Sequence, residues 1–125
     1  MFFQIDPSNG LAIYDQIVRQ VKFAVADEVL SPGELVPSVR ELARELRINP
    51  NTVTRAYREL QSDRVLQTVR GTGLEVAPGA VKRCRTDRTK LIRQRIGHVL
   101  TEAVQSGIAE DELRKMIDEE LKNVK

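Results

Sequence analysis

Residues 38–60, SVRELARELRINPNTVTRAYREL, contain the start patterns of two helices in quick succession. Ser38 and Glu41 form an S-x-x-E capping box, in which each side chain accepts a hydrogen bond from the backbone N–H of the other residue. Asn49 is a favoured N-cap type, and Pro50 follows at the first helical position, where its missing N–H costs nothing. Two short helices joined by so tight a turn are typical of a helix-turn-helix.

The helix that starts at Asn49 separates apolar and polar residues onto two faces. Its apolar residues keep the i, i+3, i+4, i+7 spacing of a buried stripe: Val53, Ala56, Tyr57 and Leu60. A solvated polar face is the better interpretation for an arbitrary amphipathic helix. Here, however, the polar types hydrogen-bond base edges and phosphates, and lysine and glutamate are scarce among them: Asn51, Thr54, Arg55, Arg58 and Ser62. Since the second helix of a helix-turn-helix enters the major groove, contact with DNA is predicted.

Further elements are predicted on both sides of these helices. Apolar residues at helical spacing over residues 11–25 predict a first helix of about five turns, and residues 2–5 have a strand-like composition. Downstream, RVLQTV (64–69) predicts a strand, RGTG a glycine turn and LEV (74–76) the returning strand of a small wing. The predicted fold is mainly α with a small β wing, a winged helix-turn-helix over residues 1–77.

A short linker leads to two further helical patterns in the last part of the chain. Apolar residues recur at helical spacing over residues 91–103 and again over residues 113–124, with Ser106 and Gly107 between them. A lone helical hairpin cannot bury both apolar stripes, so dimerisation is the economical expectation. Residues 78–125 are therefore expected to be a two-helix tail that forms a homodimer.

Composition excludes several classes of function. The single cysteine, Cys84, and the single histidine, His98, give no basis for a disulfide, a metal cluster or a Cys–His nucleophile. Without a phosphate-cradling glycine loop either, neither enzymatic activity nor a cofactor is expected. No stretch approaches the roughly 20 apolar residues of a membrane span, and the N-terminus lacks a signal pattern. A cytoplasmic protein without a membrane partner is expected.

The net charge of +2 conceals two basic stretches. Residues 47–70 hold five arginines against two acids, and residues 82–95 hold seven cations against Asp87 alone. The second stretch lies near a helix start, where the helix dipole disfavours cations. Two interpretations stay open: a solvated face that pairs with the acidic last helix, or phosphate contacts beside the wing by Lys82 and Arg83.

The segment PGELVPSVRELARELRINPNTVTRAYREL, followed by RGTG, resembles the winged helix-turn-helix domain of the GntR family of bacterial transcription regulators. The upstream IDPSNGLAIYDQIVRQVK and the short tail resemble its YtrA-type subfamily, in which two C-terminal helices dimerise the protein without a separate ligand-binding domain. The resemblance implies that Arg40 contacts DNA, together with residues of the second helix of the motif: Asn51, Thr52, Thr54 and Arg55. It also implies that the wing tip reaches the minor groove through Arg70, Gly71 and Thr72.

Two arginines depart from the family pattern. In the turns before and after the DNA-contacting helix, the family generally has glycine where this chain has Arg47 and Arg64. If those turns keep a left-handed backbone, each replacement costs about 1 kcal/mol or more. Each also adds positive charge beside the expected DNA face, which makes Arg47 a candidate phosphate contact.

These features together predict a sequence-specific transcriptional regulator that binds double-stranded DNA. The resemblance favours a repressor that acts as a dimer on an inverted-repeat operator, and relatives of this type often control neighbouring transporter genes. The alternative is a winged-helix adaptor that binds proteins without sequence-specific DNA binding, which predicts an apolar or acidic face in place of the Asn/Thr/Arg face. The residues identify no small-molecule effector.

Overall fold

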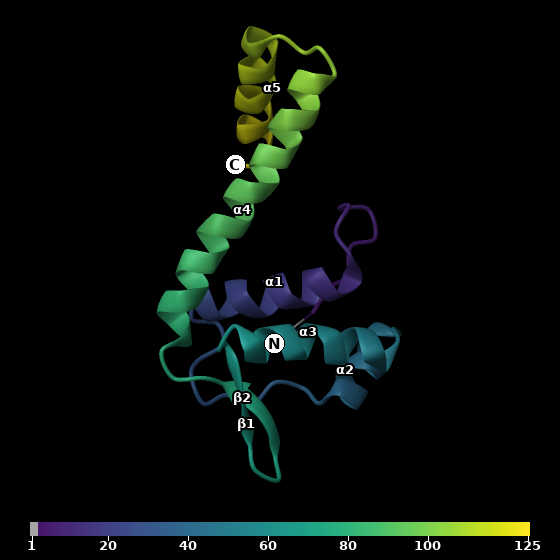
Figure 1. The fold of residues 1–125 in the computed structure, drawn as a ribbon, viewed down its shortest axis with the longest axis vertical. Coiled ribbons are helices and arrows are strands. Elements are labelled where there is room, and N and C mark those ends of the chain that lie inside the picture. The colour runs from purple at the N-terminus through teal and green to yellow at the C-terminus, as the bar shows by residue number, and fades with distance from the viewer. Residues whose placement is uncertain (1–2) are drawn as a thin grey trace. The chain divides into compact units, whose positions relative to one another are not determined.

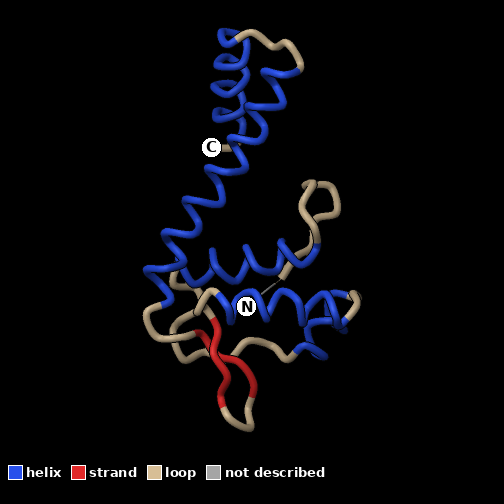
Figure 2. Tube along the Cα trace, viewed as in Figure 1, coloured by secondary structure: helices blue, strands red, loops and turns tan. Residues whose placement is uncertain are grey.

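The computed structural model describes residues 3–125 and contains five helices and one two-stranded sheet within that range (Figure 1). The elements in chain order are α1 (Ile13–Ala26), α2 (Val39–Leu46), α3 (Pro50–Ser62), β1 (Leu66–Val69), β2 (Gly73–Val76), α4 (Ala80–Gln105) and α5 (Glu110–Asn123). The predicted fold class, mainly helical with a small β wing, is confirmed (Figure 2). The chain forms two compact units, one up to Thr89 and one from Lys90 on, and α4 contributes to both.

Helices α1, α2 and α3 surround the core of the first unit. The four residues of the predicted α3 stripe are all buried, with exposures of 0 to 3%: Val53, Ala56, Tyr57 and Leu60. From α1 they meet Ile17, Val18, Val21 and Val25, and from α2 Leu42. Burying one such apolar side chain stabilises a fold by about 1.5–3 kcal/mol. The buried apolar face therefore anchors α3 in the core, and the polar face projects from this fixed helix.

Both predicted helix starts of the motif are confirmed. The Ser38 Oγ atom accepts from the Glu41 backbone N–H at 3.1 Å, and Glu41 Oε1 accepts from the Ser38 N–H at 3.2 Å. At the start of α3, Asn49 Oδ1 accepts from the Asn51 N–H at 2.8 Å, and Pro50 occupies the first helical position. Local hydrogen bonds thus set where each helix begins.

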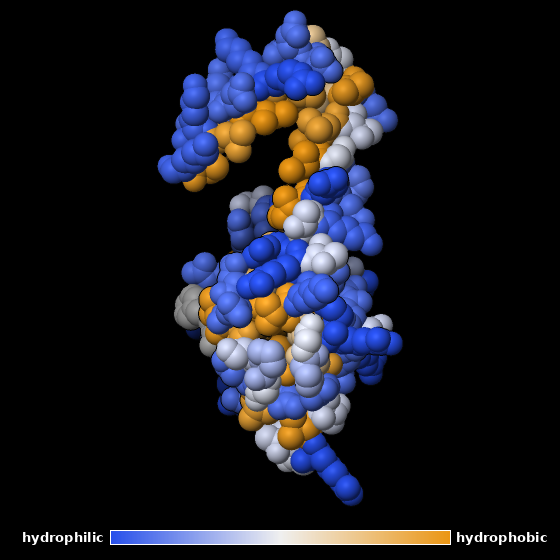
Figure 3. Space-filling model, turned by 90° about the vertical axis from the view of Figure 1, so that its left-hand side faces the viewer, coloured by the Kyte–Doolittle hydropathy of each residue, from blue (hydrophilic) through white to orange (hydrophobic). Residues whose placement is uncertain are grey.

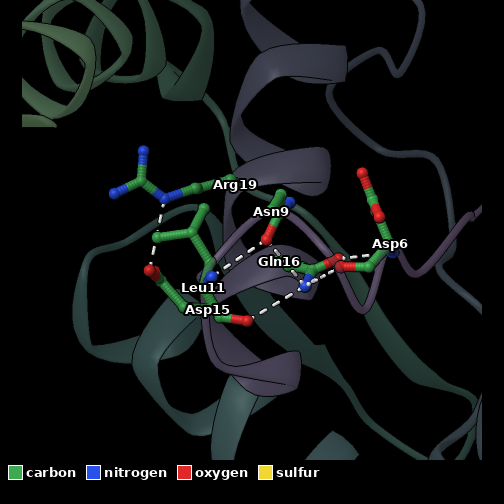
Figure 4. A network of polar contacts seen from close by, with 6 residues as sticks. All are labelled: Asp6, Asn9, Leu11, Asp15, Gln16 and Arg19. Carbon is green, nitrogen blue, oxygen red and sulfur yellow. Dashed lines mark hydrogen bonds and ion pairs between the residues drawn. The ribbon is translucent and has the colours of Figure 1, made fainter. Parts of the chain in front are cut away.

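The first helix is shorter than predicted, because the preceding residues form a side-chain network (Figure 4). Asn9 Oδ1 accepts from the Leu11 N–H at 2.9 Å. Gln16 is buried, and its Nε2 donates to the Leu11 carbonyl at 3.0 Å and to the Asp6 carbonyl at 2.8 Å. These bonds hold the Leu11 backbone in a loop, so α1 begins at Ile13 and has 14 residues.

The strand suggested by residues 2–5 is wrong for residues 3–5, which are not in a strand. Phe2 lies outside the described residues. Both backbone groups of Gln4 are bonded to one side chain instead of a neighbouring strand: its N–H donates to Gln20 Oε1 at 3.0 Å, and its carbonyl accepts from Gln20 Nε2. Phe3 is buried in the core. The apolar side chain at this position thus serves core packing and not a strand.

The wing is an antiparallel hairpin whose register runs from Leu66 opposite Val76 to Val69 opposite Gly73. Its outer edge also binds the connection between α1 and α2. The Val36 N–H donates to the Leu74 carbonyl at 3.0 Å, and the Val76 N–H donates to the Glu34 carbonyl at 2.9 Å. These bonds fasten the wing to the first unit as a third, strand-like segment would.

The second unit consists of the C-terminal part of α4 and of α5, joined by a turn in which Gly107 has φ 85°. Ala109 precedes α5 and makes no side-chain capping bond. Many large apolar residues of this unit are exposed: Ile92, Ile96, Val99, Val104, Met116, Ile117, Leu121 and Val124. Hydrophobic surface is visible along this unit in Figure 3. None of the described helices is long and apolar enough to span a bilayer.

Candidate nucleic-acid interface

The outer face of α3 carries the residues that the sequence singled out for DNA contact. Asn51, Arg55 and Arg58 are exposed, while Thr52 and Thr54 are half-buried at the margin of the core face. One helix thus presents these five side chains in fixed order, beginning in its first turn. The structure brings them together as expected from the helical spacing.

Arg55 is braced by a residue that the sequence did not identify as part of the site. Its guanidinium lies over the ring of Tyr14 of α1, 3.7 Å from the ring centroid. Such stacking is worth about 0.5–1 kcal/mol at an exposed position. Because stacking uses the flat face of the guanidinium, its in-plane N–H donors remain available for a base or phosphate. No spacing in the sequence relates Tyr14 to Arg55, since α1 and α3 meet only in the folded chain.

Helix α2 places Arg40 in its first turn, where the side chain is exposed. The entry to this helix is tied to α3, because the Tyr57 hydroxyl donates to the Pro37 carbonyl at 2.7 Å. Burial raises the pKa of Tyr57, and the nearby carboxylates of Glu41 and Glu45 add to that shift. The phenol therefore stays protonated and keeps donating, which links Arg40 to the position of α3.

The two turns that flank α3 have the left-handed backbone expected of a glycine. Arg47 has φ 57° and ψ 48°, and Arg64 has φ 61°. Glu28, after α1, has φ 60° and is a third such residue, which the sequence pattern did not predict. Each left-handed residue with a side chain costs about 1–2 kcal/mol. Arg47 and Arg64 are both exposed, so their cationic side chains lie at the two ends of α3.

The wing tip is an exposed turn formed by Arg70, Gly71 and Thr72. The Thr72 N–H closes this turn on the Val69 carbonyl at 3.0 Å. Gly71 has φ 77°, a conformation that residues with side chains rarely adopt. The turn therefore favours a glycine at this position, and it presents the Arg70 side chain beyond the end of the sheet.

The basic stretch at the start of α4 binds the ends of other helices. Arg83 donates to the Arg64 carbonyl just after α3 and to the Pro78 carbonyl at 3.2 Å. Arg85 Nε donates to the Ala26 carbonyl of α1 at 3.0 Å, and Arg88 pairs with Asp27. Cations suit helix C-termini, where the dipole is negative.

Neither sequence-based interpretation of this basic stretch predicted these backbone and side-chain partners. Lys82 is exposed.

Comparison with known proteins places this geometry in a family. The model for the GntR family of bacterial regulatory proteins matches residues 13–76. The HTH-type transcriptional repressor YtrA of Bacillus subtilis is 34% identical over 122 residues, which cover 98% of this chain and 94% of that protein. The chain also resembles the HTH-type transcriptional regulator Rv1152 of Mycobacterium tuberculosis, at 40% identity over 54% of this chain and 55% of that protein.

Solved structures agree with the match. A transcriptional antiterminator from Listeria monocytogenes has a TM-score of 0.68 at 33% identity and covers 99% of this chain and 92% of its own. YtrA from Sulfolobus acidocaldarius, a GntR-family transcription factor, has a TM-score of 0.59 at 29% identity, covering 81% of this chain and 99% of its own. The DNA-binding domain of AraR in complex with its operator ORE1 has a TM-score of 0.51 at 22% identity, covers 62% of this chain and 94% of its own, and shows a shared fold alone.

These relatives are regulators and not enzymes. The similarity to YtrA extends over nearly the whole length of both chains and so includes the tail as well as the winged helix. The chain therefore belongs to the GntR family of bacterial regulatory proteins, in its YtrA-type group, and is a transcriptional regulator.

Proposed function

We propose that this protein is a cytoplasmic repressor that binds double-stranded DNA as a homodimer on an inverted-repeat operator. Residues 1–77 are the DNA-binding domain in this proposal, and residues 78–125 are the dimerisation tail. The main support for this proposal is the outer face of α3, where Arg55 is exposed and its guanidinium is stacked on the Tyr14 ring. The name of the similar Bacillus subtilis protein, a transcriptional repressor, supports the direction of regulation.

The N-terminal part of α3 enters the major groove in this proposal. Five of its side chains contact bases and phosphates: Asn51, Thr52, Thr54, Arg55 and Arg58. Arg40 of α2 contacts the same groove or its backbone, and the wing tip reaches the minor groove through Arg70, Gly71 and Thr72. One well-placed bidentate contact discriminates against a wrong base by about 1–3 kcal/mol.

Three further cations are proposed to contact phosphates: Arg47, Lys82 and Arg83. These cations differ in the contacts that they already make within the protein. Arg83 already donates to the Arg64 and Pro78 carbonyls, whereas Lys82 is exposed. The Arg83 side chain is already held in place by these two carbonyls, so Lys82 is expected to contribute more to phosphate binding.

The tail supports the dimeric part of the proposal. Within the second unit, α4 and α5 line an open apolar groove of about 440 Å³ with Leu100, Val104, Ile108, Leu113 and Ile117. Monomeric soluble proteins rarely expose large contiguous apolar surfaces. A second copy of the tail covers this surface by two-fold symmetry, and a bound dimer then blocks a promoter sterically.

The proposal is tested with duplexes that the wild-type protein selects from a randomised DNA pool. Fluorescence anisotropy should show specific binding of inverted repeats, and sedimentation velocity should show a dimer at micromolar concentration. Arg55→Ala should weaken specific binding while its thermal unfolding stays close to that of the wild type. A wild-type protein that selects no DNA sequence would refute the proposal and favour the adaptor. A monomer would refute its dimeric part.

A further inference from the structure

Lys22 of α1 is a buried cation that joins three helices. Its side chain is 7% exposed, and its Nζ donates to Asp63 Oδ2 at 2.8 Å and to Asp87 Oδ2 at 3.0 Å. Asp63 is the residue that directly follows α3, and Asp87 lies in the third turn of α4. One ammonium group therefore bonds the end of the DNA-contacting helix and the start of the tail helix at the same time.

The charge of Lys22 persists in this environment. Burial by itself lowers the pKa of Lys22, but hydrogen bonds and charges from Asp63 and Asp87 outweigh burial and raise the pKa above its ordinary value. A buried ion group of this kind contributes little net stability compared with an apolar residue of similar size. What it requires is one geometry, since each carboxylate must stay within hydrogen-bond distance of the same nitrogen.

Two arginines fix the same junction. Arg85 bonds the Ala26 carbonyl at the end of α1, and Arg83 bonds the Arg64 carbonyl after α3. Helix α4 is continuous from Ala80 to Gln105, so its first turns belong to the first unit and its last turns to the second. The contacts of its first turns therefore fix the start of α4 against α1 and α3 within the first unit.

We propose that Lys22 is a positioning residue for operator spacing. Its bonds to Asp63 and Asp87 set the direction of α3 against the first turns of α4, and the dimer consequently accepts one separation between half-sites. Lys22 acts through α3 and α4 and does not touch the DNA. This inference rests on the proposed function as a dimer on an inverted repeat.

The experiment compares operators that differ only in spacing. Duplexes selected by the wild-type protein are remade with one or two base pairs added to or removed from the centre, and each base pair turns one half-site by about 34° relative to the other. The wild type should strongly prefer the selected spacing. Lys22→Met keeps the side-chain length without the charge, and should reduce this preference by about ten-fold, the size expected for loss of one coupled contact.

A second variant shows whether a change in spacing preference comes from the lost ion pair or from loss of folding. Asp87→Asn removes only the carboxylate charge on α4, and Asp87 is 33% exposed, so the amide stays hydrated in a folded protein. It should relax the spacing preference in the same direction as Lys22→Met. Asp15→Asn is the matched control, because Asp15 pairs with Arg19 inside α1 at 3.3 Å. It removes the same charge without loosening a junction between helices and should keep the wild-type preference.

The outcomes distinguish the inference from the function on which it rests. A wild type that binds no inverted repeat refutes the proposed function and the inference with it. A wild type that binds inverted repeats of all spacings equally refutes the inference and leaves the proposed dimer in place. A wild type with a spacing preference that Lys22→Met and Asp87→Asn both retain refutes the inference alone. Thermal unfolding accompanies each variant, and if Lys22→Met does not fold, the result with Asp87→Asn decides.

Discussion

The outer face of α3 and the first turns of α4 are both rich in arginine, yet they use these side chains differently. On α3, Arg55 rests on an aromatic ring and keeps its N–H donors free of backbone acceptors in its stacked position. At the start of α4, Arg83 and Arg85 donate to the carbonyls that end α3 and α1. A count of positive charges does not distinguish an arginine that is available to DNA from one that braces the fold. The hydrogen-bond acceptors around each guanidinium do distinguish them.

The largest expected effect is on the α3 face. Arg55→Ala removes a guanidinium that can bind a guanine edge or phosphates with two donors, so affinity for the selected operator should fall by about 1–3 kcal/mol, roughly ten-fold to a hundred-fold. Anisotropy titration measures the loss. Arg85→Ala is the comparison variant from α4: because Arg85 bonds a backbone carbonyl of the fold, it should lower the melting temperature and reduce operator affinity less than Arg55→Ala does. Equal losses of affinity in both variants would remove the contrast between the two regions.

The next effect concerns the left-handed turns at Arg47 and Arg64. Replacement by glycine relieves about 1–2 kcal/mol of backbone strain and adds unfolded-state entropy, so each variant should be more stable by roughly 0.5–1 kcal/mol. Urea unfolding measures this. Arg64→Gly keeps the backbone carbonyl that Arg83 binds, so this contact should not reduce its gain in stability. Arg47→Gly should gain stability while losing operator affinity. An Arg47→Gly protein that binds the operator as tightly as the wild type would show that Arg47 contacts no phosphate.

Removing the brace under Arg55 should have a smaller effect. Tyr14→Leu keeps an apolar side chain on α1 but abolishes the stacking, so operator affinity should fall by about 0.5–1 kcal/mol, less than in Arg55→Ala. In an Arg55→Ala background the same change should have almost no effect on binding. Additive losses in the double variant, measured by anisotropy, would mean that Tyr14 acts on DNA independently of Arg55.

The smallest effect distinguishes two neighbours in α4. If Lys82 contacts a phosphate, Lys82→Ala should reduce the slope of log affinity against log salt by about 0.9. Arg83→Ala should change the slope less, because Arg83 already has backbone acceptors. Titrations over a series of salt concentrations give both slopes. A larger change for Arg83→Ala than for Lys82→Ala would contradict this order.

Much of the winged helix could be predicted from local patterns. The bonds that start α2 and α3 join residues two or three positions apart, and the burial of Val53, Ala56, Tyr57 and Leu60 follows from helical spacing. The prediction failed where two glutamine side chains from further along the chain bonded the backbone and overrode local preference. Gln20 binds the backbone of residue 4 and Gln16 that of Leu11, so the expected strand is absent and α1 begins late.

Capping bonds and helical spacing act over a few residues, so the start of α3 and the identity of its outward side chains follow from the sequence alone. Which cations brace the fold depends on tertiary contacts. Lys22 meets Asp63 and Asp87, and Arg55 meets Tyr14, across contacts between residues far apart in the chain. Packing in three dimensions selects such partners, because burial makes an unpaired charge costly. Since the partners are far apart in the chain, no sequence periodicity indicates them.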